Sequence, residues 1–448
     1  MSLREKLNTA PRETMARTES GGASEAYKAL KGRIHLKLVD KFDLAVLETL
    51  PPERLRHEIA GMVERLLQEE QAALNDIERR LLIRDIQHEM FGFGPLELLM
   101  ADPAVSDILV NSYHRIFVER GGKLELTNVT FNDEQHLMRI IDKIVSLVGR
   151  RIDESSPMVD ARLPDGSRVN AVIPPVALDG PMVSIRRFAQ IPLKMDNLVH
   201  DLKSLTPEMA AMLEGLCVAK VNMLISGGTG AGKTTLLNIL SGYIPQSERI
   251  ITIEDAAELQ LQQPHVVRLE TRPMNIEGRG EVSQRALVRN ALRMRPDRIV
   301  IGEVRGAEAV DMLQAMNTGH EGSLTTIHAN TPRDALARLE NMIGMADLDL
   351  PHRAARQQIA SAITVVIQAL RLPDGKRKIT SIQEITGMEG DIITMQEIFA
   401  YRQTGIGVDG EVQGYFQATG IRPKFADRLR SFGVALPDAM FDPARRFQ

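Results

Sequence analysis

A glycine-rich stretch near the middle of the chain has the residue types and spacing of a phosphate-binding loop, or P-loop. In "VNMLISGGTGAGKTTLLNIL", Gly227 is followed after four residues by Gly232, Lys233 and Thr234. Glycines let backbone N–H groups wrap around phosphates, the following helix adds the positive end of its dipole, and the lysine reaches the β- and γ-phosphates. A chance glycine-rich turn is the weaker interpretation, because a strand-like run precedes the loop and a helical pattern follows it. The expected nucleotide-binding residues are Gly227, Gly228, Thr229, Gly230, Ala231, Gly232, Lys233, Thr234 and Thr235.

Four acidic residues accompany two other apolar runs. Glu303 directly follows the buried-strand pattern in "PDRIVIGEVRG", and Glu254, Asp255 and Glu258 lie in "IITIEDAAELQL". Parallel sheets place their sites at the carboxyl ends of strands, where a carboxylate can order Mg²⁺ and polarise the attacking water. We expect Glu303 to position that water, with Glu258 as the second catalytic candidate, and Glu254 and Asp255 to bind near the nucleotide. Mg²⁺ would bind Thr234, with Glu303 or Glu258 acting through water. Solvated acids at strand ends are the alternative.

The segment "TGHEGSLTTIHANTP" contains two histidines, His320 and His328, among small residues. An imidazole can donate a hydrogen bond to a phosphate oxygen, and a loop of glycines and threonines leaves room for close approach. Ordinary loop or core histidines are the alternative for both positions. A zinc site is disfavoured, because the segment offers no third ligand.

An arginine stripe lies in "SQRALVRNALRMRPD", where Arg285, Arg289 and Arg293 recur every four residues. This spacing places them on one face of a helix. A solvated basic face and a face toward an anion or another subunit both remain open.

Composition limits the class of protein. The 448 residues suggest about two or three domains. The single cysteine, Cys217, excludes an intrachain disulfide and a cysteine-based zinc site. Tryptophan is absent, aromatic residues make up 4%, and the formal net charge is -4, all of which argue against nucleic-acid binding as the main activity. No secretory signal or membrane-spanning run is visible, so we expect a cytoplasmic protein.

The elements that must position these residues follow an α/β pattern from about residue 206 onward, in the order helix, apolar strand, glycine loop, helix, strand. Upstream, helical stripes give way to a strand, a Gly-Gly turn and a strand in "RIFVERGGKLELTNVTF". Asn75 has the position of a helix N-cap. The predicted regions are a flexible tail (1–33), a helical module (34–100), a mixed α/β domain (101–190), a linker (191–205) and an α/β nucleotide-binding domain (206–448).

Four motifs in this order resemble those of the secretion-superfamily ATPases, which power type II secretion, type IV pili and type IV secretion. The P-loop "GGTGAGKTT" is followed by "TIEDAAEL", similar to the Asp box, by "RMRPDRIVIGEVRG", similar to Walker B, and by "TGHEGSLTTIHANTP", similar to the His box. The resemblance covers about residues 85–400. "RGEVSQRALVRNALRMRPDRIVIGEVRG" is most similar to the Tad/Flp pilus ATPases of the CpaF kind. The tetracysteine insertion common in type II secretion members is missing, which favours the CpaF and type IV secretion branches.

The resemblance implies a PAS-like N-terminal domain and a RecA-like P-loop ATPase domain, with ATP and Mg²⁺ as ligands. It implies that the His box senses the γ-phosphate, and that N-terminal arginines approach the same phosphate. Arg168 and Arg186 match those arginines best, with Arg162 and Arg187 as competitors. It further implies a homohexamer that is peripheral at the inner membrane and works with pilus or secretion platform proteins.

The function expected from the resemblance is a hexameric motor that powers assembly of Tad/Flp-type pili, and possible retraction. A type IV secretion ATPase is the alternative. A nucleic-acid translocase is a more distant one, because no aromatic-rich basic channel is visible and no nucleic-acid partner is expected. A nucleotide switch is disfavoured by Glu303, which suits turnover.

Overall fold

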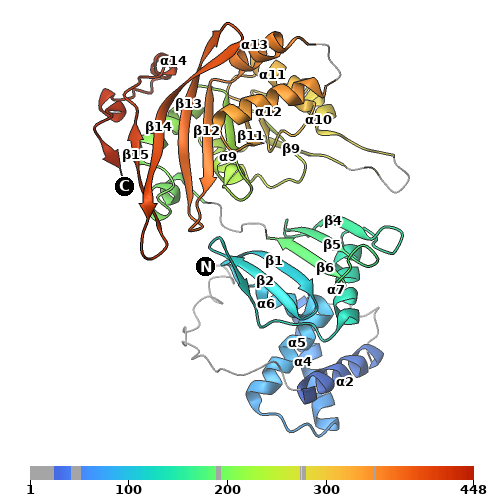
Figure 1. Cartoon of the computed structure of the whole chain (residues 1–448). Coiled ribbons are helices and arrows are strands. Elements are labelled where there is room, and N and C mark those ends of the chain that lie inside the picture. Colours follow the sequence, from blue (N-terminus) through green and yellow to red (C-terminus); the bar gives the residue numbers. More distant parts are fainter. Residues whose placement is uncertain are drawn as a thin grey trace. The chain divides into compact units, whose positions relative to one another are not determined.

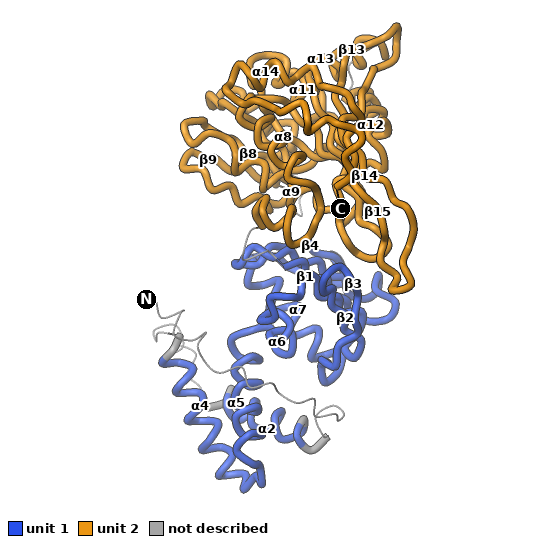
Figure 2. Tube along the Cα trace, turned by 90° about the vertical axis from the view of Figure 1, so that its left-hand side faces the viewer, with its two compact units in different colours: residues 1–187 blue, residues 188–448 orange. Residues whose placement is uncertain are grey.

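The computed structural model describes residues 25–41, 52–187, 193–272, 274, 279–346 and 350–447. The chain forms two compact units, Met1–Arg187 and Phe188–Gln448, shown in blue and orange in Figure 2. Each unit has buried apolar clusters of its own. Among the described residues, no helix is both long enough and apolar enough to cross a membrane.

The described part of unit 1 begins with a small helical module. Its helices are α2 (Glu25–Lys41), α4 (Pro52–Glu69) and α5 (Asp76–Phe91). They pack through apolar stripes in which Ile34 and Ile59 are fully buried. The prediction that Asn75 caps a helix is confirmed, because its side chain accepts the N–H groups of Ile77 and Glu78 at 3.0 and 2.9 Å.

Helix α2 corrects the expectation of a flexible tail over residues 1–33. The chain is helical from residue 25, and Leu30, Ile34 and Leu38 recur every four positions on its buried side. Leu36 is apolar but exposed on another side of the helix, so the helix has only a weak amphipathic pattern. Residues 1–24 lie outside the described residues.

A six-stranded antiparallel sheet occupies the rest of the described part of unit 1, in the order β3-β2-β1-β6-β5-β4. Its core joins the sheet to α7, for example Ile108 and Val118 to Leu137 and Ile141. The predicted hairpin is confirmed, since β2 and β3 pair on either side of the two glycines. The elements are η1 (Gly94–Leu96), α6 (Glu97–Met100), β1 (Val105–Ser112), β2 (Arg115–Arg120), β3 (Lys123–Leu126), α7 (Glu134–Leu147), β4 (Met158–Arg162), β5 (Arg168–Val172) and β6 (Met182–Arg186).

Unit 2 is built on a sheet of ten described strands in the order β16-β15-β14-β13-β12-β7-β11-β10-β8-β9 (Figure 1). The six strands from β12 to β9 are parallel, and β13 to β16 extend the sheet in antiparallel fashion. The strands are β7 (Met223–Gly227), β8 (Ile250–Glu254), β9 (Val266–Glu270), β10 (Arg298–Ile301), β11 (Leu324–His328), β12 (Val365–Arg371), β13 (Arg377–Glu389), β14 (Ile392–Ile406), β15 (Val412–Ala418) and β16 (Arg446–Phe447).

Helices cover both faces of this sheet, which explains why its central strands are buried and mainly apolar. One apolar cluster contains residues of α8, α9 and α14, and the other contains residues of α10, α11, α12 and α13. Every residue of β7, β8 and β10 is buried. The helices of the unit are η2 (Asn197–Asp201), α8 (Pro207–Val218), α9 (Lys233–Ser241), α10 (Gln284–Ala291), α11 (Glu308–Asn317), α12 (Pro332–Gly344), α13 (His352–Ala362), α14 (Phe425–Ser431) and η3 (Asp438–Phe441).

Most of the segment 191–205, which was expected to be a linker, is packed against the core of unit 2. Met195, Leu198 and Leu205 are buried in the core of unit 2, and 197–201 form a short helix. Charged residues lie between these three apolar residues, so the sequence of the segment shows no clear apolar pattern. Residues 191 and 192 lie outside the described residues. The expected fold class, an α/β protein with a helical module, a mixed α/β domain and a P-loop domain, is confirmed.

Candidate nucleotide-binding site

The carboxyl ends of the parallel strands of unit 2 meet at one edge of the sheet. Gly227 of β7 is paired with His328 of β11 on one side and with Ala369 of β12 on the other. Strands β8 and β10 are parallel neighbours that end at Glu254 and Ile301. The P-loop, both predicted acidic segments and His328 therefore leave the sheet on the same side.

The P-loop has backbone geometry that depends on its glycines. Gly230 and Gly232 have φ values of 70° and 91°, a region that side-chain-bearing residues rarely adopt. A Cβ on Gly227 would lie 2.5 Å from the carbonyl oxygen of Ala369, so the strand end also requires glycine. Helix α9 begins immediately after Gly232. A glycine loop that leads into a helix N-terminus fits a nucleotide phosphate group.

Lys233 lies inside this loop. Its Nζ donates to the carbonyl oxygen of Gly228 at 3.0 Å. Burial lowers the pKa of Lys233, and the carboxylate of Glu303 opposes that shift. Thr234 follows in the first turn of α9, where its hydroxyl is available as a Mg²⁺ ligand. Lys233 and Glu303 are therefore close enough for their charges to interact, and Thr234 is adjacent to Lys233.

Glu303 and Asp255 are joined by an arginine that the sequence did not single out. Arg305 Nη2 is 2.9 Å from Glu303 Oε2, and Arg305 Nη1 is 3.2 Å from Asp255 Oδ2. The sequence signal was present in "GEVRG", because the arginine follows the glutamate by two residues. This bridge holds the two predicted acidic segments together at the strand ends.

Glu254 is buried beside the peptide that precedes Glu303. Its Oε2 accepts the N–H groups of Glu258 and Leu259 at 2.7 and 2.9 Å, and burial raises its pKa. A Cβ on Gly302 would lie 3.2 Å from its Cγ. Its Oε1 is buried and has no hydrogen-bond partner among the described residues. An acceptor oxygen of this kind, next to the P-loop edge, fits a water or Mg²⁺-bound water.

His328 lies beside the P-loop, whereas the expectation for His320 needs correction. Burial lowers the pKa of His328, and the charge of Lys233 lowers it further. His320 precedes β11, so it lies at the amino end of the strand that His328 ends. The two histidines therefore do not approach the same phosphate within this chain, because the whole length of strand β11 separates them.

The loop around His320 has a structural role at the opposite edge of the sheet. Arg298 is fully buried, pairs with Glu248 at 2.6 Å, and donates to the carbonyl oxygen of Gly322 at 3.3 Å. A Cβ on Gly322 would come within 2.4 Å of the Arg298 guanidinium. Ser323 Oγ donates to the carbonyl oxygen of His320 at 2.8 Å. The glycine in this part of the motif makes room for a buried ion pair.

The predicted arginine stripe on α10 is partly exposed, with Arg285 half-buried and Arg289 and Arg293 exposed. Arg285 and Arg289 each contact one oxygen of Asp311 on α11 at 2.8 Å. Arg293 lies beyond the end of α10 at Ala291. The first two arginines therefore join α10 to α11, and the exposure of Arg289 and Arg293 is compatible with a solvated basic face.

In unit 1, three of the four N-terminal arginine candidates lie side by side. Arg162 is paired with Arg168, and Arg168 with Arg186, across β4, β5 and β6. Arg186 Nε donates to Asp107 Oδ1 at 3.1 Å. Arg187 instead turns back into its own unit, where its Nη1 contacts the carbonyl oxygens of two residues near the start of β1. Arg187 is therefore no longer a candidate for contacting a phosphate. The arginine row of unit 1 consists of Arg162, Arg168 and Arg186.

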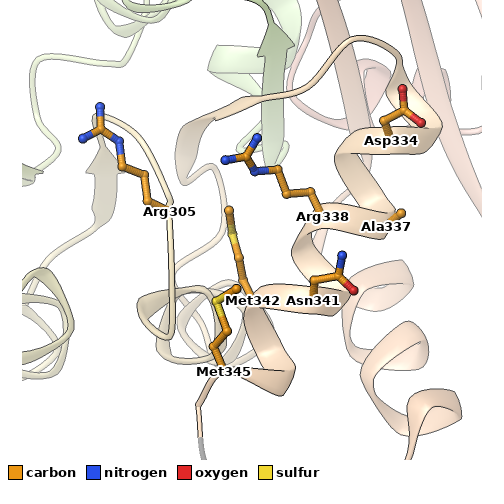
Figure 3. Close-up of a pocket in the computed structure, with 7 residues that line it drawn as sticks. All are labelled: Arg305, Asp334, Ala337, Arg338, Asn341, Met342 and Met345. Atoms are coloured by element: carbon orange, nitrogen blue, oxygen red, sulfur yellow. The ribbon is translucent and has the colours of Figure 1, made fainter.

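A pocket of about 480 Å³ adjoins the site on the α12 side. Figure 3 shows Arg305, on the loop after β10, and Arg338, on α12, on opposite sides of it. Arg338 Nη1 donates to the carbonyl oxygen of His328 at 2.7 Å. Met342 and Met345 form the apolar part of the wall. No spacing in the sequence predicts that Arg338 approaches the site, because it depends on how α12 packs.

Comparisons with known proteins identify the family of this chain. The family described as "Type II/IV secretion system protein" matches residues 89–406. A protein of Mycobacterium tuberculosis whose name assigns it to conjugal transfer is 40% identical over 325 residues, which cover 71% of this chain and 92% of that protein. Conjugal transfer protein TrbB of Rhizobium radiobacter is 31% identical over 313 residues, 69% and 91% of the two chains. The solved VirB11 ATPase of the Brucella suis type IV secretion system is 29% identical, covers 64% and 94%, and has a TM-score of 0.35.

The family match spans all four motifs, from the P-loop to the segment that ends at Pro332. It also spans most of the sheet domain of unit 1 and the strands of unit 2 as far as β14. The predicted resemblance to the secretion superfamily is thereby confirmed. The chain belongs to the type II/IV secretion system protein family, and it is an ATPase with a RecA-like nucleotide-binding domain.

Proposed function

We propose that this ATPase hydrolyses Mg²⁺-ATP at the P-loop edge of unit 2 and converts the energy into movement of a type IV secretion apparatus. The observation that carries the proposal is the convergence of the P-loop, Glu303, Glu254 and His328 on one edge of the sheet. The conjugal transfer and VirB11 names among the relatives support the type IV secretion process.

In the proposed reaction, the P-loop N–H groups and the ammonium of Lys233 bind the phosphates of ATP. Mg²⁺ would be held by Thr234 and would neutralise charge on the phosphates. Glu303 positions the attacking water, and Arg305 fixes the carboxylate of Glu303 through their 2.9 Å contact. Glu254, with its buried Oε1, is an additional acceptor for water at the same edge. Glu258, the second catalytic candidate, lies four residues after Glu254, and its backbone N–H donates a hydrogen bond to Glu254 Oε2.

The active assembly in this proposal is a homohexamer that works at the inner face of the membrane with platform proteins. Arg162, Arg168 and Arg186 supply further positive charge to the γ-phosphate, from the row that they form in unit 1. His328 reports the presence of that phosphate, because it ends the strand beside the P-loop.

Assembly of Tad/Flp-type pili is a second candidate process. It is favoured by the similarity of "RGEVSQRALVRNALRMRPDRIVIGEVRG" to the CpaF kind. The same motor chemistry would serve either process, so the site does not separate the two.

The test is ATPase activity measured with the purified chain alone, with its membrane platform protein, and with DNA. Stimulation by the platform protein supports a secretion or pilus motor, whereas stimulation only by DNA would favour a nucleic-acid translocase. Deletion in the native host separates the two processes, because a secretion motor is needed for substrate transfer and a Tad motor for surface pili. Preserved transfer in a strain that lacks pili would overturn the type IV secretion assignment.

A further inference from the structure

Two arginines from a distant part of the sequence lie against the P-loop. Arg371 ends β12, Arg377 begins β13, and the two are paired across the hairpin that joins these strands. Because β12 runs parallel to β7, with Ala369 opposite Gly227, the hairpin leaves the sheet beside the P-loop. The conformation of the loop therefore depends on a segment about 140 residues downstream, outside all four motifs.

Both arginines are close to Gly230. The Nε of Arg377 donates to the carbonyl oxygen of Gly230 at 2.8 Å. The Nη1 of Arg371 lies 3.2 Å from the point that a Cβ on Gly230 would occupy. Gly232 is also near, since a Cβ there would lie 3.4 Å from Cδ of Arg377. Two guanidinium groups thus occupy one side of the central part of the loop.

The hydrogen bond from Arg377 also determines the direction of the backbone N–H group of Ala231. A trans peptide is planar, and its C=O and N–H groups point in opposite directions. Because Arg377 holds the oxygen of Gly230, the N–H of Ala231 points away from Arg377. That N–H donates to the oxygen of Gly228 at a long 3.4 Å, and Lys233 Nζ donates to the same oxygen at 3.0 Å. The Ala231 N–H and the Lys233 ammonium are therefore on the same, inner side of the loop.

We propose that Arg377 is a positioning residue of the nucleotide site, which holds the Gly230–Ala231 peptide with its N–H group toward the bound phosphates. Gly230 is the position where such control is needed, because it has no side chain to restrict rotation of the peptide. Arg371 packs against the same glycine and limits its movement. The proposal rests on nucleotide binding at the P-loop and does not depend on which process the ATPase powers.

A positioning role of this kind affects binding more than chemistry. The P-loop backbone contacts phosphates that ATP and ADP share, so its misplacement weakens both ligands to a similar extent. Loss of such uniform binding raises KM and leaves kcat nearly unchanged. We expect Arg377→Ala to raise the KM for ATP and the Kd for ADP about tenfold, the size of effect typical of one charge-assisted hydrogen bond. Arg377→Lys keeps the charge and recovers part of the affinity.

The experiment measures binding of a fluorescent ADP analogue and steady-state ATP hydrolysis by the full chain. Lys376→Ala is the matched control, because Lys376 is adjacent but, among the described residues, its side chain pairs with Glu411 at 2.8 Å and Asp374 at 4.0 Å, which are not part of the loop. Binding by the wild type establishes the nucleotide site independently of the role of Arg377. Ethylguanidine is then added to Arg377→Ala, since a free guanidinium can restore the missing donor. The expected results are a tenfold loss for Arg377→Ala, no loss for Lys376→Ala, and partial rescue by ethylguanidine.

Three results would overturn the positioning role. The first is wild-type ADP affinity in a folded Arg377→Ala protein. The second is an equal loss in Lys376→Ala, which would indicate a general effect of the hairpin. The third is a fall in kcat at unchanged KM, which would make Arg377 part of the chemical step. An Arg377→Ala protein that melts at a lower temperature is still informative, because rescue of ADP binding by ethylguanidine distinguishes positioning from loss of structure.

Discussion

Lys233 is the residue whose loss should affect nucleotide binding most directly. Among the described residues, its side chain donates a hydrogen bond only to the carbonyl oxygen of Gly228, within the loop itself, so its removal leaves the apolar core untouched. We predict that Lys233→Ala abolishes nucleotide binding or turnover while the chain stays folded. Binding of a fluorescent ATP analogue measures the first, and circular dichroism with thermal melting checks the second. Wild-type turnover by a well-folded Lys233→Ala protein would disprove the site assignment.

Glu303 is the residue expected to act on water. We predict that Glu303→Gln binds ATP with near-normal affinity and hydrolyses it at least ~10²-fold more slowly, as for the loss of a general base. Glutamine can still accept the hydrogen bond from Arg305, so the local packing is preserved. Single-turnover kinetics measure the chemical step apart from product release. An unchanged rate would transfer the role to Glu258 or to Glu254, which Glu254→Gln and Glu258→Gln would distinguish.

At the scale of elements, strand β11 separates two histidines that the sequence presents as a pair. We predict that His328→Ala still binds ATP but hydrolyses it poorly and responds alike to ADP and to a non-hydrolysable ATP analogue. His320→Ala should keep turnover and the difference between the two ligands, because His320 belongs to the opposite edge. Small-angle scattering or protease protection with each ligand reports this difference. If His328→Ala distinguishes the ligands as well as the wild type does, the sensor hypothesis is wrong.

Helices α2, α5 and α7 are joined by a buried network centred on Glu89. Its Oε1 contacts Lys31 Nζ at 2.8 Å and its Oε2 contacts His136 Nε2 at 2.9 Å. Burial alone would raise the pKa of Glu89, but the hydrogen bond from His136 and the charge of Lys31 outweigh it and lower the pKa to about 2. The network therefore connects the helical module to the sheet domain within unit 1.

This lowered pKa gives a pH prediction. A carboxylate with a depressed folded-state pKa stabilises the protein above its ordinary pKa of 4.5, and that contribution is lost as pH falls toward about 2. Glu89→Gln should therefore lower the free energy of unfolding at neutral pH, by up to about 3 kcal/mol, and flatten its fall between these pH values. Hydrogen exchange of α5 and α7 measures the effect, with the exposed Glu58→Gln as control. Equal pH dependence in Glu89→Gln and wild type would contradict it.

The elements that the sequence predicted are those with local signals. The P-loop combines strand, glycines and helix within 20 residues, and the Asn75 cap needs only the next turn. The start of helix α2 was missed because its buried stripe is narrow and the apolar Leu36 lies outside it, so the helical period is weak in the sequence. The position of His320 was missed because spacing along the chain does not reveal that a whole strand lies between two residues.

Within the site, the residues that sequence reasoning missed are contributed by tertiary packing. Arg305 had a signal, since it follows Glu303 by two residues. Arg338 and Arg377 had none, because each reaches the site from a helix or hairpin that follows a separate part of the chain. Motif spacing predicts the groups that contact a ligand better than the groups that hold those contacts in place.

At the scale of the whole molecule, the charges proposed to act on one phosphate are divided between the two units. The P-loop, Glu303 and His328 belong to unit 2, whereas Arg162, Arg168 and Arg186 form their row in unit 1. Within unit 1 the three arginines are neighbours on adjacent strands, and Arg186 also pairs with Asp107 at 3.1 Å. Guanidinium groups form strong, charge-assisted hydrogen bonds with phosphates, which is the physical argument for our proposal that these arginines contribute to the site.

The last prediction concerns the assembly. We expect a closed ring of six subunits in which Arg168→Ala and Arg186→Ala lower kcat while ADP affinity stays near normal, because these arginines act on the γ-phosphate. Arg120→Ala is the matched control, since it lies on the same sheet and pairs with Asp102 and Glu125 at 3.0 and 3.1 Å. Light scattering across ATP concentrations measures the ring. A strictly monomeric chain with full activity would contradict the assembly.

Mixing two impaired variants then tests whether the arginines act between subunits. Lys233→Ala subunits keep the arginine row but lack a working P-loop, and Arg168→Ala subunits have the reverse defect. If the arginine of one subunit completes the site of its neighbour, mixed rings regain part of the wild-type activity. The recovered fraction is limited to the interfaces where a subunit with intact arginines adjoins a subunit with an intact P-loop. If each subunit completes its own site, mixtures stay as inactive as their components at every ratio. The dependence of activity on mixing ratio therefore decides whether ATP is bound within one chain or between two.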